Sequence, residues 1–276
     1  MKRLTVIAIG FSLIVGGSLL AQPVDATGGM KYLVGLGDSR AAGGGLPAHS
    51  DESPSRYDAA CERSPYASIA YLANATSTPV VNYSCVGATT DDLYSSGRFN
   101  KTRVPSQISQ IEDYVLTDEG TVFIIQTGAN DMKWKTVLAR CARTECGAKK
   151  RDDVAVKILI KNYERRMNKA IMTLRKKGAE GRIVLAGLYT PIPSDAAVLE
   201  KHGITRSERT WIEGAIRQFN DKSEEIADKH NNVDFAPIYL GDSDIQMMDD
   251  PMPFHPTISG QQSVARQLEA VIDSRL

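Results

Sequence analysis

Short apolar runs that are typical of buried strands alternate with longer stretches of helical periodicity, and this order constrains the fold of the chain most. The clearest strand pattern is Thr121–Thr127, and the clearest helical pattern runs from about Asp153 to Lys177 and is followed by Gly178. Strands separated by helices pair in parallel and need cover on both faces. The sequence therefore predicts an α/β fold, a three-layer α/β/α sandwich with a parallel sheet of about five strands.

The remaining elements follow from the same two periodicities. The other predicted strands are Tyr32–Leu36, Val80–Tyr83, Arg182–Leu188 and Val233–Ala236. The other predicted helices are Pro65–Leu72, Pro105–Tyr114, Arg206–Lys229 and Ser259–Ser274. Two long loops are expected, Gly43–Glu62 and Tyr189–Thr205. Ligands of such folds bind beyond the carboxyl ends of the strands, so motifs that directly follow strands are the candidates for function.

The first residues have the pattern of an export signal. Lys2 and Arg3 precede an uncharged apolar run from Leu4 to about Ala21, and Val24-Asp25-Ala26 offers small residues for cleavage. The alternative is an uncleaved anchor helix, because the run is close to the ~20 residues that span a bilayer. We expect residues 1–26 to be a signal peptide and residues 27–276 to form one domain, secreted or associated with the cell envelope. No stable membrane insertion is expected after cleavage.

The charge balance excludes no enzyme class but argues against two kinds of partner. Lys and Arg number 33, as do Asp and Glu. A neutral total gives no sign of binding to nucleic acid or to an anionic membrane surface, although it does not reveal a local patch.

Four cysteines, Cys61, Cys85, Cys141 and Cys146, fit an exported chain with two disulfides. Three pairings are possible. The spacing favours Cys141–Cys146 as a small loop, which leaves Cys61–Cys85. A zinc site is the alternative, and it is disfavoured because the chain has no Cys-x-x-Cys pair with a histidine nearby.

The first candidate motif, Gly35–Gly43, follows the first predicted strand. A dinucleotide-binding Gly-x-Gly-x-x-Gly would need glycine where Arg40 stands, so that interpretation fails. The remaining interpretation is a nucleophile, Ser39, at a strand-to-helix turn, where its own N–H can help hold an oxyanion. The alternative is a helix N-cap formed by Asp38 or Ser39.

Two further motifs follow the next two strands. Gly87 lies just past Val80–Tyr83 and could present a bare backbone N–H to a substrate; the alternative is a simple turn glycine. Asn130, in Gly128-Ala129-Asn130-Asp131, offers a side-chain N–H donor at a strand end; the alternative is an Asx turn.

A histidine precedes the last predicted helix. His255, in Phe254-His255-Pro256, is the candidate general base, since imidazole titrates near neutrality. His49, in the loop after Ser39, is the competing base. His202 and His230 fall in polar segments.

Taken together, Gly-Asp-Ser, a later Gly, Gly-x-Asn-Asp and a late His-Pro-x-x-x-Gly resemble the SGNH-hydrolase (GDSL esterase/lipase) superfamily from about Tyr32 to the C-terminus. The chain is most similar to the secreted actinobacterial lipase and esterase branch. Cys61 and Cys85 bracket the first two motifs as in that branch, and Arg63-Ser64-Pro65-Tyr66 strengthens the resemblance.

The resemblance implies a flavodoxin-like fold with Ser39 as nucleophile and His255 as base. It also implies an oxyanion hole from the Ser39 N–H, the Gly87 N–H and the Asn130 side chain. It implies small-molecule or lipid ester substrates, a monomer, and no cofactor or metal. The chain departs from the family at Met252, where an Asp is usual three residues before the histidine. Either the Met252 carbonyl, which we favour, or the carboxylate of Asp250 or Asp249 then orients His255.

Three functions fit this pattern. The first is a serine esterase or lipase. The second, its alternative, is a cell-envelope acyltransferase or a sugar-ester deacetylase on the same scaffold. The third is a non-catalytic binding module, which the complete set of Ser39, Gly87, Asn130 and His255 argues against.

Overall fold

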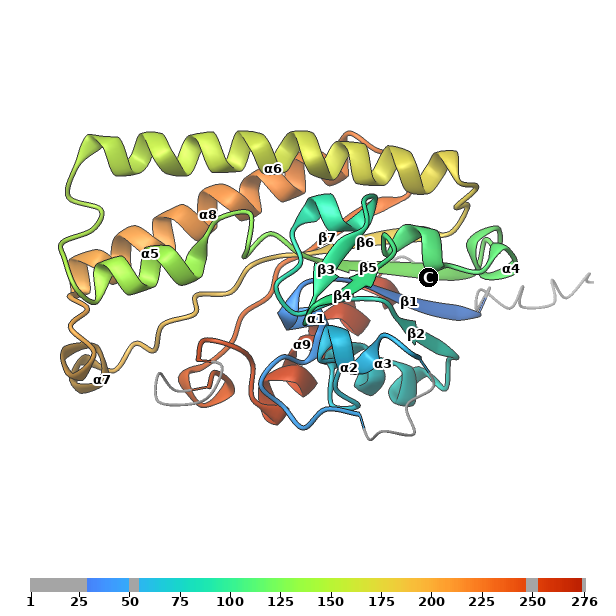
Figure 1. Ribbon diagram of the computed structural model, residues 1–276, viewed down its shortest axis with the longest axis horizontal. Coiled ribbons are helices and arrows are strands. Elements are labelled where there is room, and N and C mark those ends of the chain that lie inside the picture. Colours follow the sequence, from blue (N-terminus) through green and yellow to red (C-terminus); the bar gives the residue numbers. More distant parts are fainter. Residues whose placement is uncertain (1–28, 50–54, 247–252, 275–276) are drawn as a thin grey trace, which may run out of the picture.

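The computed structural model describes residues 29–49, 55–246 and 253–274. Its centre is a five-stranded sheet in the order β2-β1-β5-β6-β7, with every neighbouring pair parallel (Figure 1). The strands are β1 (Tyr32–Gly37), β2 (Val80–Asn82), β5 (Thr121–Gln126), β6 (Arg182–Ala186) and β7 (Val233–Ala236). The sheet and its helices form the predicted α/β/α sandwich.

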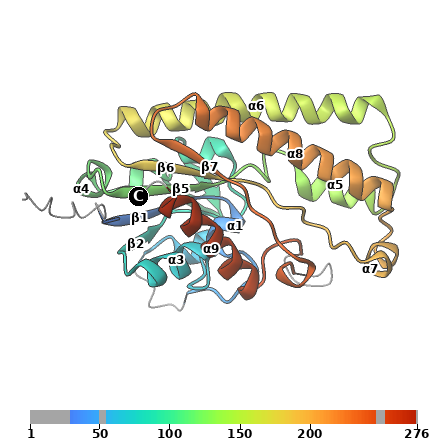
Figure 2. The same ribbon diagram turned by 180° about the vertical axis from the view of Figure 1, so that it is seen from behind.

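One face of the sheet is covered by α3 (Ser68–Thr76) and α9 (Ile258–Asp273), which lie side by side below it in both views (Figures 1 and 2). Alternation along the strands decides which side chains face this layer. Leu33 of β1 and Ile124 of β5 are buried here with Leu72 of α3 and Leu268 of α9. This layer therefore fixes α9, which directly follows the segment that carries His255.

The opposite face is covered by the two longest helices, α6 (Lys150–Lys176) and α8 (Arg206–Asp228). Val34 and Phe123 point to this side, together with Ile160 of α6 and Phe219 of α8. The buried positions of α6 recur every three to four residues, as the sequence predicts. Both helices extend beyond the carboxyl ends of the strands, where α5 (Trp134–Cys141) lies near them (Figure 1).

Most predicted elements exist, but one predicted helix is wrong. Pro105–Tyr114 contains only the short 3₁₀ helix η2 (Ile108–Gln110) and the start of α4 (Asp113–Leu116). The apolar residues Ile108, Ile111 and Val115 are buried as expected, because separate turns place their side chains in the core just as one helix would. The predicted helix Pro65–Leu72 begins later, at Ser68, and ends at Thr76.

Several small elements were not predicted. A hairpin joins β3 (Gly97–Phe99) to β4 (Thr102–Val104). The two long loops contain short helices, α2 (Asp58–Cys61) and α7 (Ala196–Lys201). The 3₁₀ helices η1 (Thr90–Leu93) and η3 (Asp242–Asp244) and the one-turn helix α1 (Ser39–Ala42) complete the list. Within the described ranges, no helix combines the length and the apolar character needed to cross a bilayer.

Two disulfides are present, Cys61–Cys85 and Cys141–Cys146, which are the pairings that the spacing favours. Cys141, Cys146 and the buried Glu208 form the one cluster of metal-ligand residues among the described residues. The zinc alternative is wrong for these cysteines, because each sulfur is bonded to the other cysteine and is not a free thiolate.

Removing the disulfides should destabilise the fold unequally. The two bonds span sequence separations of 24 and 5 residues. Loop-closure entropy then gives about 3.5 kcal/mol for Cys61–Cys85 and about 2 kcal/mol for Cys141–Cys146. Urea unfolding of the two paired Cys→Ser variants should show the larger loss for Cys61→Ser/Cys85→Ser. Equal midpoints for both variants and the wild type would refute the estimate.

Candidate active site

The turn that presents Ser39 directly follows β1, which pairs with β2 on one side and with the central strand β5 on the other. β1 ends at Gly37, and Asp38 is the N-cap of α1, its carboxylate accepting from the Arg40 N–H at 2.9 Å. Gly37 has φ +143°, and a Cβ there would lie 2.1 Å from the carbonyl oxygen of Gln126. Only glycine fits this close crossing of β1 and β5. The N-cap interpretation is therefore correct for Asp38, and Ser39 begins the helix.

A buried glutamine holds the same turn from the side. The Gly37 N–H donates to Gln107 Oε1 at 2.7 Å, and Gln107 Nε2 donates to the Gly37 carbonyl at 2.8 Å. Both hydrogen bonds are shielded from water, since Gln107 is 2% exposed. The amide thus satisfies both backbone polar groups of Gly37, two residues before Ser39.

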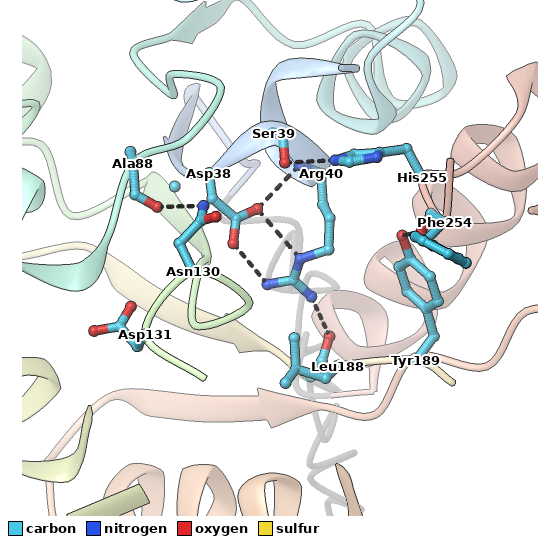
Figure 3. A network of polar contacts seen from close by, with 12 residues as sticks. Asp38, Ser39, Arg40, Ala88, Asn130, Asp131, Leu188, Tyr189, Phe254 and His255 are labelled. Carbon is cyan, nitrogen blue, oxygen red and sulfur yellow. Dashed lines mark hydrogen bonds and ion pairs between the residues drawn. The ribbon is translucent and has the colours of Figure 1, made fainter. Parts of the chain in front are cut away.

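Behind Ser39 lies a buried ion pair within the turn (Figure 3). Arg40 Nε lies 3.2 Å from Asp38 Oδ1, and Arg40 Nη1 donates to the Gly187 carbonyl at 3.1 Å. The guanidinium therefore connects the turn at Ser39 to the loop that follows β6. Buried charges of this kind are tolerated because they are paired and hydrogen-bonded.

Ser39 and His255 meet although they are 216 residues apart. Ser39 Oγ lies 2.7 Å from His255 Nε2, and the two side chains point toward one another in Figure 3. His49, the competing base of the sequence analysis, does not form this contact. On the other side of the imidazole, Nδ1 lies 3.0 Å from the Pro253 carbonyl oxygen. A carbonyl there accepts the Nδ1 proton and leaves Nε2 free to take a proton from the serine.

The segment that carries His255 is held by Tyr189. The Tyr189 hydroxyl donates to the Phe254 carbonyl at 2.8 Å, from the loop after β6 (Figure 3). Burial raises the pKa of Tyr189, so the hydroxyl remains protonated and keeps donating. The two predicted orienting residues, Met252 and Asp250, lie outside the described residues together with Asp249. Their roles stay predictions.

Two backbone N–H groups near Ser39 are available to a ligand. Within the described part of the chain, neither the Ser39 N–H nor the Gly87 N–H donates to another protein group. Gly87 is exposed and has φ +83°, with open space where a Cβ would stand. Free donors of this kind, facing an electrophilic carbonyl, form an oxyanion hole.

Asn130 contributes a third donor from the loop after β5. Its Nδ2 donates to the Ala88 carbonyl at 2.8 Å, which fixes the amide beside Gly87. An amide nitrogen carries two hydrogens, so one remains for a ligand. The next residue, Asp131, accepts from the Thr90 N–H at 2.9 Å and from Arg166 Nη1 at 3.0 Å. The bond between Thr90 and Asp131 joins the segment that bears Gly87 to the loop that bears Asn130.

Two opposing effects act on the pKa of the Asp131 carboxyl. Burial raises the pKa of Asp131, while the hydrogen bonds from Thr90 and Arg166 oppose that rise. The carboxylate side chain is fully buried against Arg166, which also pairs with Asp91 at 2.9 Å. Polar groups therefore fix the spacing of Gly87 and Asn130.

A cavity of about 290 Å³ lies beside Ser39. Ser39, His255, Gly87 and Asn130 lie at one side of it, and most of the remaining wall is apolar. That wall is formed mainly by Val86, Trp134, Leu138, Leu188, Pro191 and Phe254. A second hollow of about 500 Å³ lies between the Cys141–Cys146 loop and the start of α8, and neither Ser39 nor a histidine lines it. The chemistry is therefore assigned to the smaller cavity.

A family model, the GDSL-like lipase/acylhydrolase family, matches residues 36–263, and so includes every residue of this cavity. The chain belongs to this family. The GDSL-like protein is thus a carboxylic ester hydrolase, in agreement with the SGNH resemblance of its motifs. A search of curated protein sequences finds no match.

Solved structures agree with this fold. A phospholipase A1 from Streptomyces albidoflavus NA297 is 21% identical, with TM-score 0.65, over 87% of this chain and 99% of that one. An extracellular lipase from Streptomyces rimosus is 17% identical, with TM-score 0.66, over 87% and 99%. A family two carbohydrate esterase from Clostridium thermocellum is 14% identical, with TM-score 0.53, over 89% of this chain and 64% of that one.

Sequence reasoning did not find several residues that build the GDSL-like site. Gln107 and Tyr189 act through hydrogen bonds to residues 70 and 65 positions away, and Pro253 acts through its backbone carbonyl; no motif marks such contacts. Arg63 had a signal, since it stands in the Arg-Ser-Pro-Tyr segment. It is buried, pairs with Asp58 at 2.7 Å and donates to the Ser84 carbonyl at 2.8 Å. It thereby supports the loop that bears Gly87.

Proposed function

We propose that this hydrolase cleaves esters with apolar acyl groups through an acyl-enzyme on Ser39, with His255 as the general base. The observation that carries the proposal is the 2.7 Å contact between Ser39 Oγ and His255 Nε2 at the edge of an apolar cavity. A hydroxyl within hydrogen-bond reach of an oriented imidazole is the arrangement that activates a serine nucleophile.

In the first step, Ser39 Oγ attacks the ester carbonyl carbon while its proton passes to His255 Nε2. The carbonyl oxygen becomes an oxyanion, which accepts hydrogen bonds from the Ser39 N–H, the Gly87 N–H and Asn130 Nδ2. Neither backbone donor has another partner among the described residues, so no existing protein bond is lost. Each such donor lowers a barrier by about 3–4 kcal/mol in measured cases.

The tetrahedral intermediate then collapses as His255 gives its proton to the leaving alcohol. Water attacks the acyl-enzyme with His255 again as base, and the acid leaves. The imidazole is positively charged in both transition states, and the Pro253 carbonyl faces its Nδ1 at 3.0 Å. A neutral acceptor stabilises this charge less than a carboxylate does, so it contributes mainly by fixing the tautomer and the ring.

The wall of the cavity favours an apolar acyl group over a sugar. Trp134, Leu138, Leu188 and Phe254 offer packing surface and few hydrogen-bond partners for hydroxyl groups. Transfer of the acyl group to an alcohol and deacetylation of sugar esters remain the alternatives on this scaffold.

We further propose that the enzyme acts outside the cell as a monomer of one domain, residues 27–276, after loss of residues 1–26. Two disulfides support an oxidising compartment. The basic and apolar pattern of the first residues supports export.

A panel of p-nitrophenyl esters from acetate to palmitate tests the substrate class. We expect kcat/KM to rise from acetate to medium chains, by up to about fourfold per methylene, because each buried CH₂ contributes about 0.8 kcal/mol. Leu138→Phe, which narrows the cavity, should move the optimum to shorter chains. A preference of tenfold or more for acetylated sugars, or dominant transfer to an added alcohol, would favour the alternatives instead.

A further inference from the structure

Positive charge is concentrated in one part of this neutral chain, next to the catalytic cavity. Residues 133–161 hold nine Lys or Arg against three Asp or Glu, while the whole chain has 33 of each. This stretch comprises α5, the Cys141–Cys146 loop and the first half of α6. A local excess of six positive charges was hidden in the neutral total on which the sequence analysis relied.

The outer face of α6 is both basic and apolar. Arg151, Val154, Ile158, Lys161 and Arg165 are all exposed, and their spacing of three and four residues places them in one stripe. We call this stripe the basic face. Val154 is 48% exposed and Ile158 is 55% exposed, and both lie between the cations. In Figure 1, α6 lies at the upper edge of the molecule, with no element above it.

Most of this charge is not compensated within the molecule. Of the nine cations, only Arg140 is paired with a carboxylate, that of Asp152 at 3.1 Å, among the described residues. Asp153 accepts from Trp211 Nε1 at 2.9 Å and forms no ion pair with Arg151 among the described residues. Lys149, Lys150 and Arg151 stand at the N-terminal end of α6, where positive charge opposes the helix dipole. Helix stability therefore does not explain them.

The basic face is connected to the catalytic cavity through α5. A groove of about 320 Å³ lies between the two helices, lined by Val137 and Arg140 of α5, by Lys133 just before it, and by Ile158 and Leu159 of α6. The same helix α5 supplies Trp134, Lys135 and Leu138 to the wall of the catalytic cavity. A partner that binds the basic face of α6 would therefore also lie near the cavity that Ser39 lines.

We propose that the basic face and the adjoining groove bind an anionic lipid surface and hold the enzyme at it. Anionic headgroups would pair with Arg151, Lys161 and Arg165. Val154 and Ile158 would enter the boundary between headgroups and acyl chains, as the apolar residues of interfacial helices do. Soluble polyanions are disfavoured as the partner, because they offer nothing apolar to these two side chains. The inference does not depend on the proposed acyl-enzyme mechanism.

Sedimentation with vesicles of ether-linked lipids, which the enzyme does not hydrolyse, tests the proposal. The full protein should bind phosphatidylglycerol vesicles and not phosphatidylcholine vesicles, and rising salt should weaken the binding. Arg151→Glu/Lys161→Glu should lower the partition coefficient at least twentyfold, and Ile158→Ser about fivefold. Arg217→Glu/Arg266→Glu is the matched control: it changes the net charge equally on α8 and α9 and should bind as the wild type does.

Results of two kinds would overturn the proposal. One is absence of wild-type binding to phosphatidylglycerol, or equal losses in the two double variants. The other is unchanged vesicle binding by Ile158→Ser together with equally tight binding to dextran sulfate, which would identify a site for soluble polyanions. All variants should hydrolyse soluble p-nitrophenyl butyrate at the wild-type rate. Failure of the vesicle experiment is therefore distinguishable from failure of the esterase assignment.

Discussion

Ser39→Ala should lower kcat on p-nitrophenyl butyrate by about 10⁶-fold, the loss measured when the serine of a catalytic triad is removed. The hydroxyl that contacts His255 at 2.7 Å is then absent, and no acyl-enzyme can form. Some rate above the uncatalysed reaction should remain, because the oxyanion donors and the cavity are intact. Steady-state kinetics on a preparation free of other esterases measures the loss, and mass spectrometry should find a fluorophosphonate only on wild-type Ser39.

The matched control for this variant is Ser109→Ala, at an exposed serine in η2. It should retain wild-type kinetics. Ser39→Ala itself should unfold at the wild-type urea concentration within experimental error, since Ser39 is not part of the core. Activity within tenfold of wild type, or a fluorophosphonate bound elsewhere in the wild-type protein, would refute the assignment of the nucleophile.

His255→Ala should cost a similar factor, about 10⁴ or more in kcat, because the serine loses its base and the leaving alcohol loses its acid. KM should change little, since the apolar wall that binds the acyl group is untouched. His230→Ala, at a histidine whose Nε2 lies 2.7 Å from Asn168 Oδ1, is the control and should leave kcat unchanged. A His255→Ala enzyme that keeps a tenth of the wild-type kcat would exclude His255 as the base.

The same kinetics separate the two ways of orienting His255. If backbone carbonyls orient the imidazole, Asp250→Asn and Asp249→Asn should each change kcat by less than about threefold. A carboxylate partner is worth about 10⁴ in a serine triad, so a loss of that size in either variant would identify it as the third member. That result would contradict a main-chain acceptor while leaving the roles of Ser39 and His255 in place.

The sequence was most informative where local pattern and burial coincide. β5 is buried along its whole length and α6 has a regular apolar face, so a continuous apolar run located the strand and periodicity located the helix. The segment 105–114 misled because Ile108, Ile111 and Val115 fit a helical face equally well when separate turns place them in the core. The β3–β4 hairpin has only three residues in each strand, too few for alternation to be recognised.

The site was predicted to the extent that its chemistry lies in motifs. Ser39, Gly87, Asn130 and His255 each stand directly after a strand or before a helix, in residue patterns that resemble a known family. Pro253, by contrast, acts through a carbonyl that every residue possesses, so no side chain marks it. Gln107 reaches Gly37 from 70 residues away in the chain, and only the folded structure shows that they meet. The basic face was missed because charge was summed over the chain rather than over a surface.

Helix α5 contributes to the acyl cavity at its first turn and ends at the disulfide-bonded Cys141. None of Ser39, Gly87, Asn130 or His255 belongs to it. One part of the acyl cavity, formed by Trp134, Lys135 and Leu138, is therefore encoded in a stretch of the gene apart from the proposed reacting groups. Laboratory recombination confined to residues 134–138 would vary that part of the wall and leave Ser39, Gly87, Asn130 and His255 in place.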